Sequence, residues 1–229
     1  RVLNMDKQLI IFIAPPGAGK GTQADMLAEK SGFIHIETSK IIEEKFRDAE
    51  PGDPAMEEEK RRWLEGELVD AHKVARWLLD RVGKLAGEGK SLVLSASPRA
   101  LFEVEVELPE FEELYGRDNI KIFYLTLSEE ESVRRNSERR ICEKNRHPIP
   151  RPEYDPRFKD IITCPWDGSP IITRALDKPE VIRERYKIYK AETEPVFNYF
   201  REKGYKIIEI NGEQPIDKVF EDIMKIFLG

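Results

Sequence analysis

The stretch "FIAPPGAGKGTQ", residues 12–23, lies between an apolar run and a segment, "ADMLAEK", that is predicted to be helical. It holds three glycines, two prolines and one lysine, more than a tight turn requires. Backbone N–H groups at the start of a helix form an anion site, and glycines let an anion approach them closely. Lys20 can reach the terminal phosphates of a nucleotide as a point charge. The stretch therefore predicts a phosphate-binding loop between a strand and a helix.

This loop departs in two places from the general pattern G-x-x-x-x-G-K-[ST]. Ala14 stands where the first glycine is expected, and Gly21 separates Lys20 from Thr22. The alternative interpretation is a plain glycine-rich turn. The strand–loop–helix context that the pattern requires favours the phosphate-binding interpretation.

Length and composition predict a soluble protein that consists of one large domain or of one domain with insertions. The chain has 229 residues, of which 36% are charged, and a formal net charge of −6. No segment approaches the roughly 18 unbroken apolar residues that a membrane span needs. The negative balance argues against nucleic acid as a partner. The first residues lack the apolar middle of a signal peptide, and two cysteines make no disulfide framework, so a reducing cytoplasm is expected.

Five short apolar runs predict the strands of one sheet: "QLIIFIA", "GFIHIE", "SLVLSA", "IKIFYLTL" and "YKIIEI". Nearly continuous apolar runs are typical of strands buried on both faces. Helical spacing of apolar residues separates the runs, as in residues 67–85 and 216–227. Alternating strands and helices predict an α/β fold with a parallel sheet and helices on both faces.

Two segments interrupt this alternation. Residues 39–66 are helical in pattern and very charged, and their charges are most simply a solvated surface. Residues 141–175 are rich in proline, contain both cysteines and show little apolar periodicity. A stretch this long without a clear core contribution is usually a functional lid or disordered.

The form P-G-x-G-K-G-T-Q resembles the adenylate kinase family of nucleoside monophosphate kinases, and the resemblance extends over nearly the whole chain. "ETSK" retains one residue of a Thr-Gly-Asp stretch, "GELVDAH" supplies the Gly, Leu and Val of Gly-x-Leu-Val-x-Asp, and "SASPR" matches the end of Asp-Gly-x-Pro-Arg. "INGEQP" matches a loop that contacts the ATP base. The positions that carry the resemblance beyond the loop are Thr38, Gly66, Leu68, Val69, Pro98, Arg99, Arg135, Arg139, Arg174, Arg185, Gly212 and Gln214.

The resemblance implies a P-loop NTPase fold in three parts: a core of residues 1–38, 67–138 and 176–229, a nucleoside-monophosphate-binding insertion of residues 39–66, and a lid of residues 139–175. It implies reversible transfer of the ATP γ-phosphoryl group to a nucleoside monophosphate, with AMP as the default acceptor and Mg²⁺ bridging the ATP phosphates. Such transfer asks for positioning and cations rather than covalent chemistry.

The resemblance also implies a role for each site residue. Lys20, Arg139, Arg174 and Arg185 act on the transferring phosphoryl group, and Arg99 holds the acceptor phosphate. ATP is held by the loop, Arg135 and the base loop, a set comprising Gly17, Ala18, Gly19, Lys20, Gly21, Thr22, Arg135, Gly212 and Gln214. The acceptor is held by Thr38, Leu68, Val69, Arg99 and Glu103.

Three departures from the family pattern leave alternatives open. Glu43 replaces an acceptor-binding arginine, Ser95 a magnesium-side aspartate, and Glu103 a glutamine that reads the acceptor base. An ionised Glu103 only accepts hydrogen bonds, so guanine or cytosine could suit it as well as adenine. The alternatives are therefore a kinase for CMP, UMP or GMP and a nucleotide-binding relative with weak catalysis. A simpler alternative is that Glu43 and Glu103 face solvent.

The lid contains a candidate metal site. Cys164-x-x-Asp167 resembles the second half of the zinc lid of some bacterial adenylate kinases, whose first half is Cys-x-x-Cys. Cys142 is present, Asn145 occupies the second cysteine position, and His147 could replace it. Cys142, His147, Cys164 and Asp167 are ligand types that zinc accepts. The alternative is a metal-free lid with two reduced thiols. His35 and His72 are assigned to packing or surface, and a monomer is the default.

Overall fold

The computed structural model describes residues 7–64, 69–95, 97–144, 147–149, 152, 156–173 and 177–229. Three residues singled out from the sequence, Gly66, Leu68 and Arg174, lie outside the described residues. Within them, no helix is long and apolar enough to cross a membrane.

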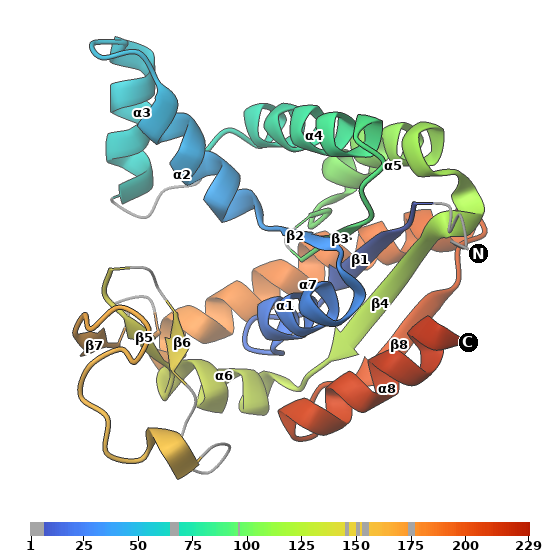
Figure 1. The fold of residues 1–229 in the computed structure, drawn as a ribbon. Coiled ribbons are helices and arrows are strands. Elements are labelled where there is room, and N and C mark those ends of the chain that lie inside the picture. Colours follow the sequence, from blue (N-terminus) through green and yellow to red (C-terminus); the bar gives the residue numbers. More distant parts are fainter. Residues whose placement is uncertain are drawn as a thin grey trace. The chain divides into compact units, whose positions relative to one another are not determined.

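The five apolar runs form one sheet, as the sequence predicts (Figure 1). Its strands are β1 (Leu9–Ile13), β2 (Ile34–Ile36), β3 (Leu92–Leu94), β4 (Ile120–Thr126) and β8 (Ile207–Asn211), in the order β2-β3-β1-β4-β8. β1 is parallel to both of its neighbours, with Leu9 opposite Leu92 and Ile120. Every residue of β1 is buried, which explains its unbroken apolar sequence.

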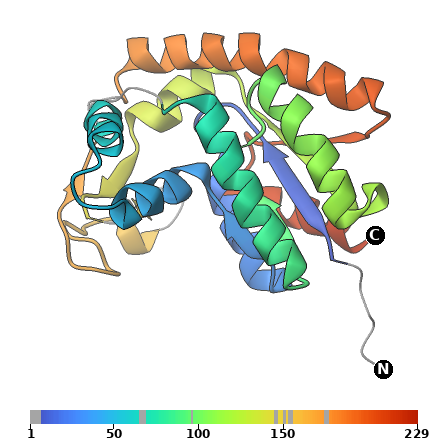
Figure 2. The same cartoon turned by 90° about the horizontal axis from the view of Figure 1, so that it is seen from above.

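Helices follow the strands as expected for an α/β fold. They are α1 (Lys20–Ser31), α2 (Thr38–Asp48), α3 (Pro54–Leu64), α4 (Ala71–Gly87), α5 (Leu101–Tyr115), α6 (Glu129–Ser137), α7 (Pro179–Glu202) and α8 (Ile216–Leu228), with one-turn helices at Arg117–Asn119 and Pro156–Phe158. α1 contacts β1, β2 and β3. α4 lies beside α5 in both ribbon views (Figures 1 and 2).

The contacts divide the chain into two compact units. The first comprises the described residues up to Ile13, Lys20–Tyr124 and Glu192–Ile208, and the second comprises Ala14–Gly19, Leu125–Ala191 and Glu209–Gly229. The division into core, insertion and lid that the resemblance implies is functional and stays a prediction.

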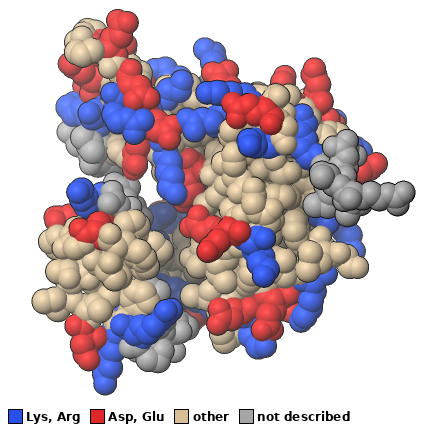
Figure 3. Space-filling view, viewed as in Figure 1, with Lys and Arg blue, Asp and Glu red and all other residues tan. Residues whose placement is uncertain are grey.

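The described residues of the charged segment 39–66 lie mainly in α2 and α3, whose surface carries intermingled acidic and basic side chains (Figure 3). It is more than a solvated surface, because Ile42 and Phe46 are buried together with Val69 and Val74. Met56, Trp63 and Trp77 pack against this cluster.

The segment predicted to form the lid contains three short strands that its sequence pattern did not reveal. They are β5 (Arg140–Cys142), β6 (Pro148–Ile149) and β7 (Ile171–Ile172), in an antiparallel sheet of order β6-β5-β7. Strands of two or three residues are too short for a recognisable alternation of apolar and polar side chains.

Candidate functional site

The loop between β1 and α1 is tightly held. Gly17 and Gly19 have φ values of +83° and +81°, a region that residues with a Cβ rarely adopt. A Cβ at Gly17 would overlap the side-chain amide of Asn136, whereas one at Gly19 would meet nothing within 4 Å. Ser132 Oγ donates to the carbonyl of Pro16 at 2.6 Å, and Asn136 Nδ2 donates to the carbonyl of Ser132 at 2.8 Å. These contacts from α6 fix the shape of the loop.

α1 begins at Lys20, directly after the loop, with Gly21 and Thr22 in its first turn. The first N–H groups of a helix have no partner within the helix and carry its positive dipole end. Together with Lys20, they provide the donors and the charge that a phosphate group needs. Along the chain, the loop, the lysine and the start of the helix therefore follow one another in the predicted order.

Within the second unit, Arg139 is paired with a buried carboxylate, and the charges of both groups affect Arg185. Arg139 donates to Asp177 through Nε at 3.1 Å and Nη2 at 2.7 Å, and Asp177 is 5% exposed. Burial, followed by the nearby charge of Arg139, lowers the pKa of Arg185. Arg185 Nη1 is buried and has no hydrogen-bond partner among the described residues. Two guanidinium groups around one carboxylate leave an excess positive charge suited to an anion.

Arg135 lies against the predicted base loop. Its Nη1 donates to the carbonyl of Gly212 at 2.8 Å, and its Nε donates to Glu131 at 2.6 Å. A Cβ at Gly212 would lie 2.5 Å from the carbonyl oxygen of Thr126, so a glycine is needed there. Gln214 donates to the carbonyl of Asn211 at 3.1 Å. The structure therefore joins Arg135 and Gly212 within the second unit.

The first unit holds the residues predicted for the acceptor. Thr38 begins α2 and is buried, and Val69 belongs to the apolar cluster with Ile42 and Phe46. The Arg99 side chain is 54% exposed, and its backbone N–H donates to Glu103 Oε2 at 2.5 Å. Glu103 is only 5% exposed, so the interpretation that it faces solvent is wrong, whereas Glu43 is exposed.

The hydrogen bonds of two polar groups in the first unit were not anticipated. Both ring nitrogens of His35 have polar partners. Its Nδ1 lies 2.6 Å from Asp25 Oδ1, and its Nε2 lies 2.6 Å from Ser95 Oγ. Glu107 is fully buried, with Oε1 2.6 Å from Ser97 Oγ. The four-residue spacing of Glu103 and Glu107 could have indicated that their carboxyl groups lie close together, since residues four apart share a helix face. The indication was weak because the sequence "EVEVE" alternates polar and apolar residues, which is typical of a strand.

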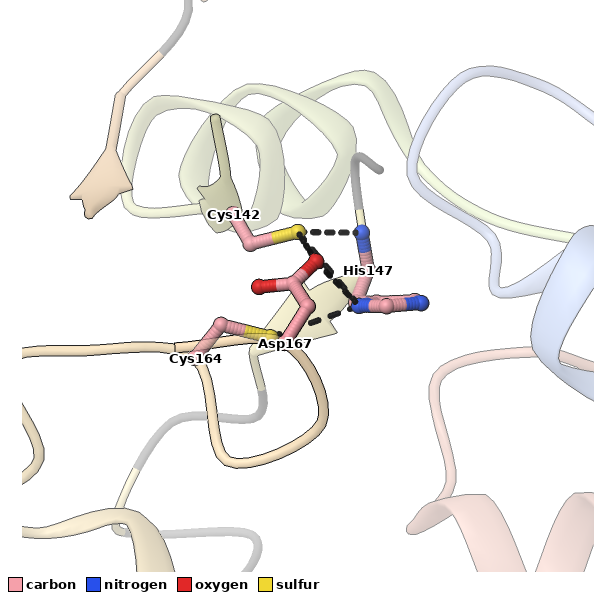
Figure 4. A group of neighbouring side chains, drawn as sticks. All are labelled: Cys142, His147, Cys164 and Asp167. Carbon is pink, nitrogen blue, oxygen red and sulfur yellow. Dashed lines mark hydrogen bonds and ion pairs between the residues drawn. The ribbon is translucent and has the colours of Figure 1, made fainter. Parts of the chain in front are cut away.

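The four candidate metal ligands of the lid converge (Figure 4). Their donor atoms all lie within 4.8 Å of one another. His147 Nδ1 lies 3.4 Å from Cys142 Sγ, and 3.3 Å from both Cys164 Sγ and Asp167 Oδ2. Asp167 Oδ1 accepts hydrogen bonds from the N–H of Ser169 at 2.9 Å and from its hydroxyl at 2.7 Å, which leaves Oδ2 turned toward the cluster.

A strand–loop–helix phosphate cradle at the start of a parallel sheet, with clustered arginines, defines a P-loop protein that handles phosphorylated nucleotides. Comparison with known proteins narrows this class. The model of the family described as "Adenylate kinase" matches residues 12–205. The chain therefore belongs to the adenylate kinase family.

Curated relatives agree over nearly their full length. A protein named adenylate kinase from Petrotoga mobilis is 35% identical over 218 residues, covering 95% of this chain and 96% of the relative. A protein of the same name from Archaeoglobus fulgidus is 34% identical over 95% of this chain and 96% of the relative. Another, from Methanothrix thermoacetophila, is 33% identical over 95% of this chain and 97% of the relative. The resemblance inferred from the sequence is confirmed.

Proposed function

We propose that this chain is an adenylate kinase, which transfers the γ-phosphoryl group of ATP reversibly to AMP and yields two ADP. The observation that carries the proposal is the loop of residues 14–19, with two glycines in the left-handed region, leading into Lys20 at the start of α1. It occurs in a chain whose relatives are named adenylate kinase.

The donor substrate is ATP together with its bound Mg²⁺. The N–H groups of Gly17, Ala18 and Gly19 and the first turn of α1, with Lys20, Gly21 and Thr22, bind its phosphates. The guanidinium of Arg135 stacks on the adenine, since a planar cation suits an aromatic face. Gly212 and Gln214 contribute the loop beside the base.

The acceptor is bound by residues of the first unit and by Leu68, which lies outside the described residues. Arg99 holds the acceptor phosphate with an exposed guanidinium and a backbone fixed by Glu103. Thr38 and Val69 contact the nucleoside, with residues 39–66 as the monophosphate-binding insertion. Glu103 lies at the position from which the base is read.

Transfer requires cations around the moving phosphoryl group and the exclusion of water. Lys20, Arg139, Arg174 and Arg185 supply the charge. The buried, unpartnered Nη1 of Arg185 supports this assignment, because an unsatisfied guanidinium N–H is costly unless an anion binds there. The acceptor phosphate is already an anion, so no general base is needed. Residues 139–175 act as the lid over the reacting groups.

We also propose that the lid cluster binds a structural Zn²⁺ through Cys142, His147, Cys164 and Asp167. Ligands about 2.0–2.3 Å from a tetrahedral zinc ion lie about 3.3–3.8 Å from one another. The contacts from His147 Nδ1, at 3.3 and 3.4 Å, have this spacing. The hydrogen bonds from Ser169 orient Asp167 as outer partners of a ligand do.

Phosphoryl transfer from Mg·ATP to AMP, CMP, UMP and GMP, with the diphosphates separated by chromatography, tests the proposed activity. We expect ADP formation to be fastest with AMP. A preference for another base would make Glu103 the residue that changed the specificity. Binding of ATP without transfer to any acceptor would contradict the proposed enzyme and favour a nucleotide-binding relative.

The remaining proposals concern the state of the protein in the cell. We propose that it acts as a monomer in the cytoplasm, with small nucleotides as its partners. Sedimentation of the chain at micromolar concentration, with and without nucleotides, tests the monomer.

A further inference from the structure

The carboxyl groups of Glu103 and Glu107 and the hydroxyl group of Ser97 form a cluster next to the backbone of Arg99. Glu107 is 0% exposed and Glu103 is 5% exposed. Ser97 Oγ lies 2.6 Å from Glu107 Oε1 and 3.3 Å from Glu103 Oε2. Glu103 Oε2 also accepts the backbone N–H of Arg99 at 2.5 Å. Glu107 Oε2 is buried without a hydrogen-bond partner among the described residues.

A count of protons decides how these groups can be arranged. If both carboxyl groups were ionised, the single hydroxyl proton of Ser97 would have to serve two buried anions, and Glu107 Oε2 would be an anionic oxygen with no donor. Such a group carries a heavy desolvation penalty. If Glu107 keeps a proton on Oε1, it donates to Ser97 Oγ. Ser97 is then free to donate to Glu103, and only a neutral carbonyl oxygen lacks a partner.

The same network reaches the backbone of Arg99 from two sides. Glu103 accepts its N–H, and Thr193 Oγ1 donates to its carbonyl at 3.1 Å. Glu103 Oε1 also lies 3.6 Å from Arg99 Nη2. The position and net charge of Glu103 therefore bear directly on the guanidinium assigned to the acceptor phosphate.

We infer that Glu107 is a positioning residue for acceptor binding: it holds a proton and, through Ser97, keeps Glu103 and Arg99 in place. This inference rests on the proposed function, because it takes Arg99 as the acceptor-phosphate residue. Ionisation of Glu107 draws the Ser97 proton away from Glu103. It also adds a second negative charge near the site of a phosphate dianion. Both effects weaken acceptor binding and spare ATP binding.

Burial is the main cause that raises the pKa of Glu107 to about 8, with the nearby Glu103 charge adding to it. The Ser97 hydrogen bond and the Arg99 charge oppose the increase. Other titratable or charged groups that contact α5 do so elsewhere on it. His72 of α4 packs on Phe102, and near the end of the helix Lys7 lies over the Tyr115 ring while Tyr205 and Arg117 contact Glu112. The proton is therefore lost in an accessible pH range.

Calorimetric titration of the full chain with AMP, and separately with ATP, tests the inference from about pH 7 to about pH 9.5, where a phosphomonoester is already a dianion. We expect the Kd for AMP to rise about tenfold across this range, because each pH unit above the pKa can cost up to tenfold. The Kd for ATP should change much less. Glu107→Gln, a neutral isostere, should flatten the AMP profile, and Glu105→Gln, an exposed position on the same helix, should leave it unchanged.

The inference about Glu107 would be overturned, and the proposed function left intact, by either of two results. One is an AMP affinity that does not vary with pH, and the other is a pH profile for Glu107→Gln as steep as that of the unaltered chain. Failure of the unaltered chain to bind AMP at pH 7 would instead overturn the proposed function. Infrared difference spectroscopy supplies a readout without nucleotide. The carbonyl band of a buried protonated carboxyl group should disappear as pH rises through about 8 and be absent in Glu107→Gln, and its absence from the unaltered chain would overturn the proton assignment.

Discussion

Arg139 shows how a buried carboxylate can hold a single side chain in one orientation. Its two hydrogen bonds to the buried Asp177 hold the guanidinium in one orientation, and Arg185 lies close enough for its pKa to be affected by both groups. Pre-orientation matters because a preorganised cation needs no rearrangement when charge develops during transfer.

Replacing Arg139 with alanine should reduce kcat by on the order of 10²-fold or more, while the Kd for ATP changes by less than about fivefold. The remaining charge of Arg185 near Asp177 limits damage to the fold. Steady-state kinetics and ATP titration measure the two effects. Arg134→Ala, an exposed position on α6, is the matched control. Equal losses of rate and of ATP binding would contradict a role in the transition state.

Gly17 and Gly19 allow a second test at the scale of one residue. An alanine at either position must adopt a left-handed backbone, which costs about 1 kcal/mol. Only Gly17→Ala must also displace Asn136, because the space around Gly19 is open. Thermal denaturation without nucleotide should therefore show a larger decrease in Tm for Gly17→Ala than for Gly19→Ala. Equal decreases would mean that the contact with Asn136 does not hold the loop.

At the scale of elements, the segment predicted to form the lid, residues 139–175, has few apolar side chains to pack. Among its described residues, Cys142, Ile149 and Cys164 form a small buried cluster, against which Phe158, Ile161 and Ile171 pack. Strands of two and three residues contribute few hydrogen bonds. A metal ion that joins β5 to the turn at Cys164–Asp167 would stabilise this segment more than its packing can.

Elemental analysis of the purified chain should find about one zinc ion per molecule, and removal by a strong chelator should lower the Tm by several degrees. Cys164→Ser should lose the metal, whereas Asp160→Asn, an exposed lid aspartate, should retain it. A metal-free protein whose two thiols react readily in the native state would contradict the zinc lid and favour reduced cysteines.

At the scale of the whole molecule, Glu107 links stability to pH. Its pKa is raised from 4.5 to about 8. Between these values the folded chain binds one more proton than the unfolded chain, so this group makes stability fall as pH rises. Above about pH 8 both states release the proton and the contribution becomes constant.

The Tm of Glu107→Gln minus the Tm of the unaltered chain should therefore increase as pH rises from about 5 to about 8 and stay constant above that. Parallel thermal denaturation over this range measures the difference, with Glu105→Gln as the exposed control. A difference that stays constant across the range would show that Glu107 is not protonated in the folded chain.

Much of the fold could be read from local sequence. β1 is recognisable because each of its side chains is buried, so its apolar run is unbroken. The phosphate-binding loop is recognisable because its chemistry depends on consecutive backbone groups and on Lys20, which are neighbours in the chain. The strands of the lid were not predictable, because two or three residues carry no periodicity.

The sequence by itself therefore determined the parallel α/β fold, the phosphate loop and the family, since each depends on local pattern or on ordered spacing along the chain. Only the tertiary structure decided which polar groups meet across long separations. It placed Arg139 on Asp177 and His35 between Asp25 and Ser95. It also buried Glu103 and Glu107 around Ser97, because burial depends on what packs above a residue and not on the residue's own neighbours in sequence.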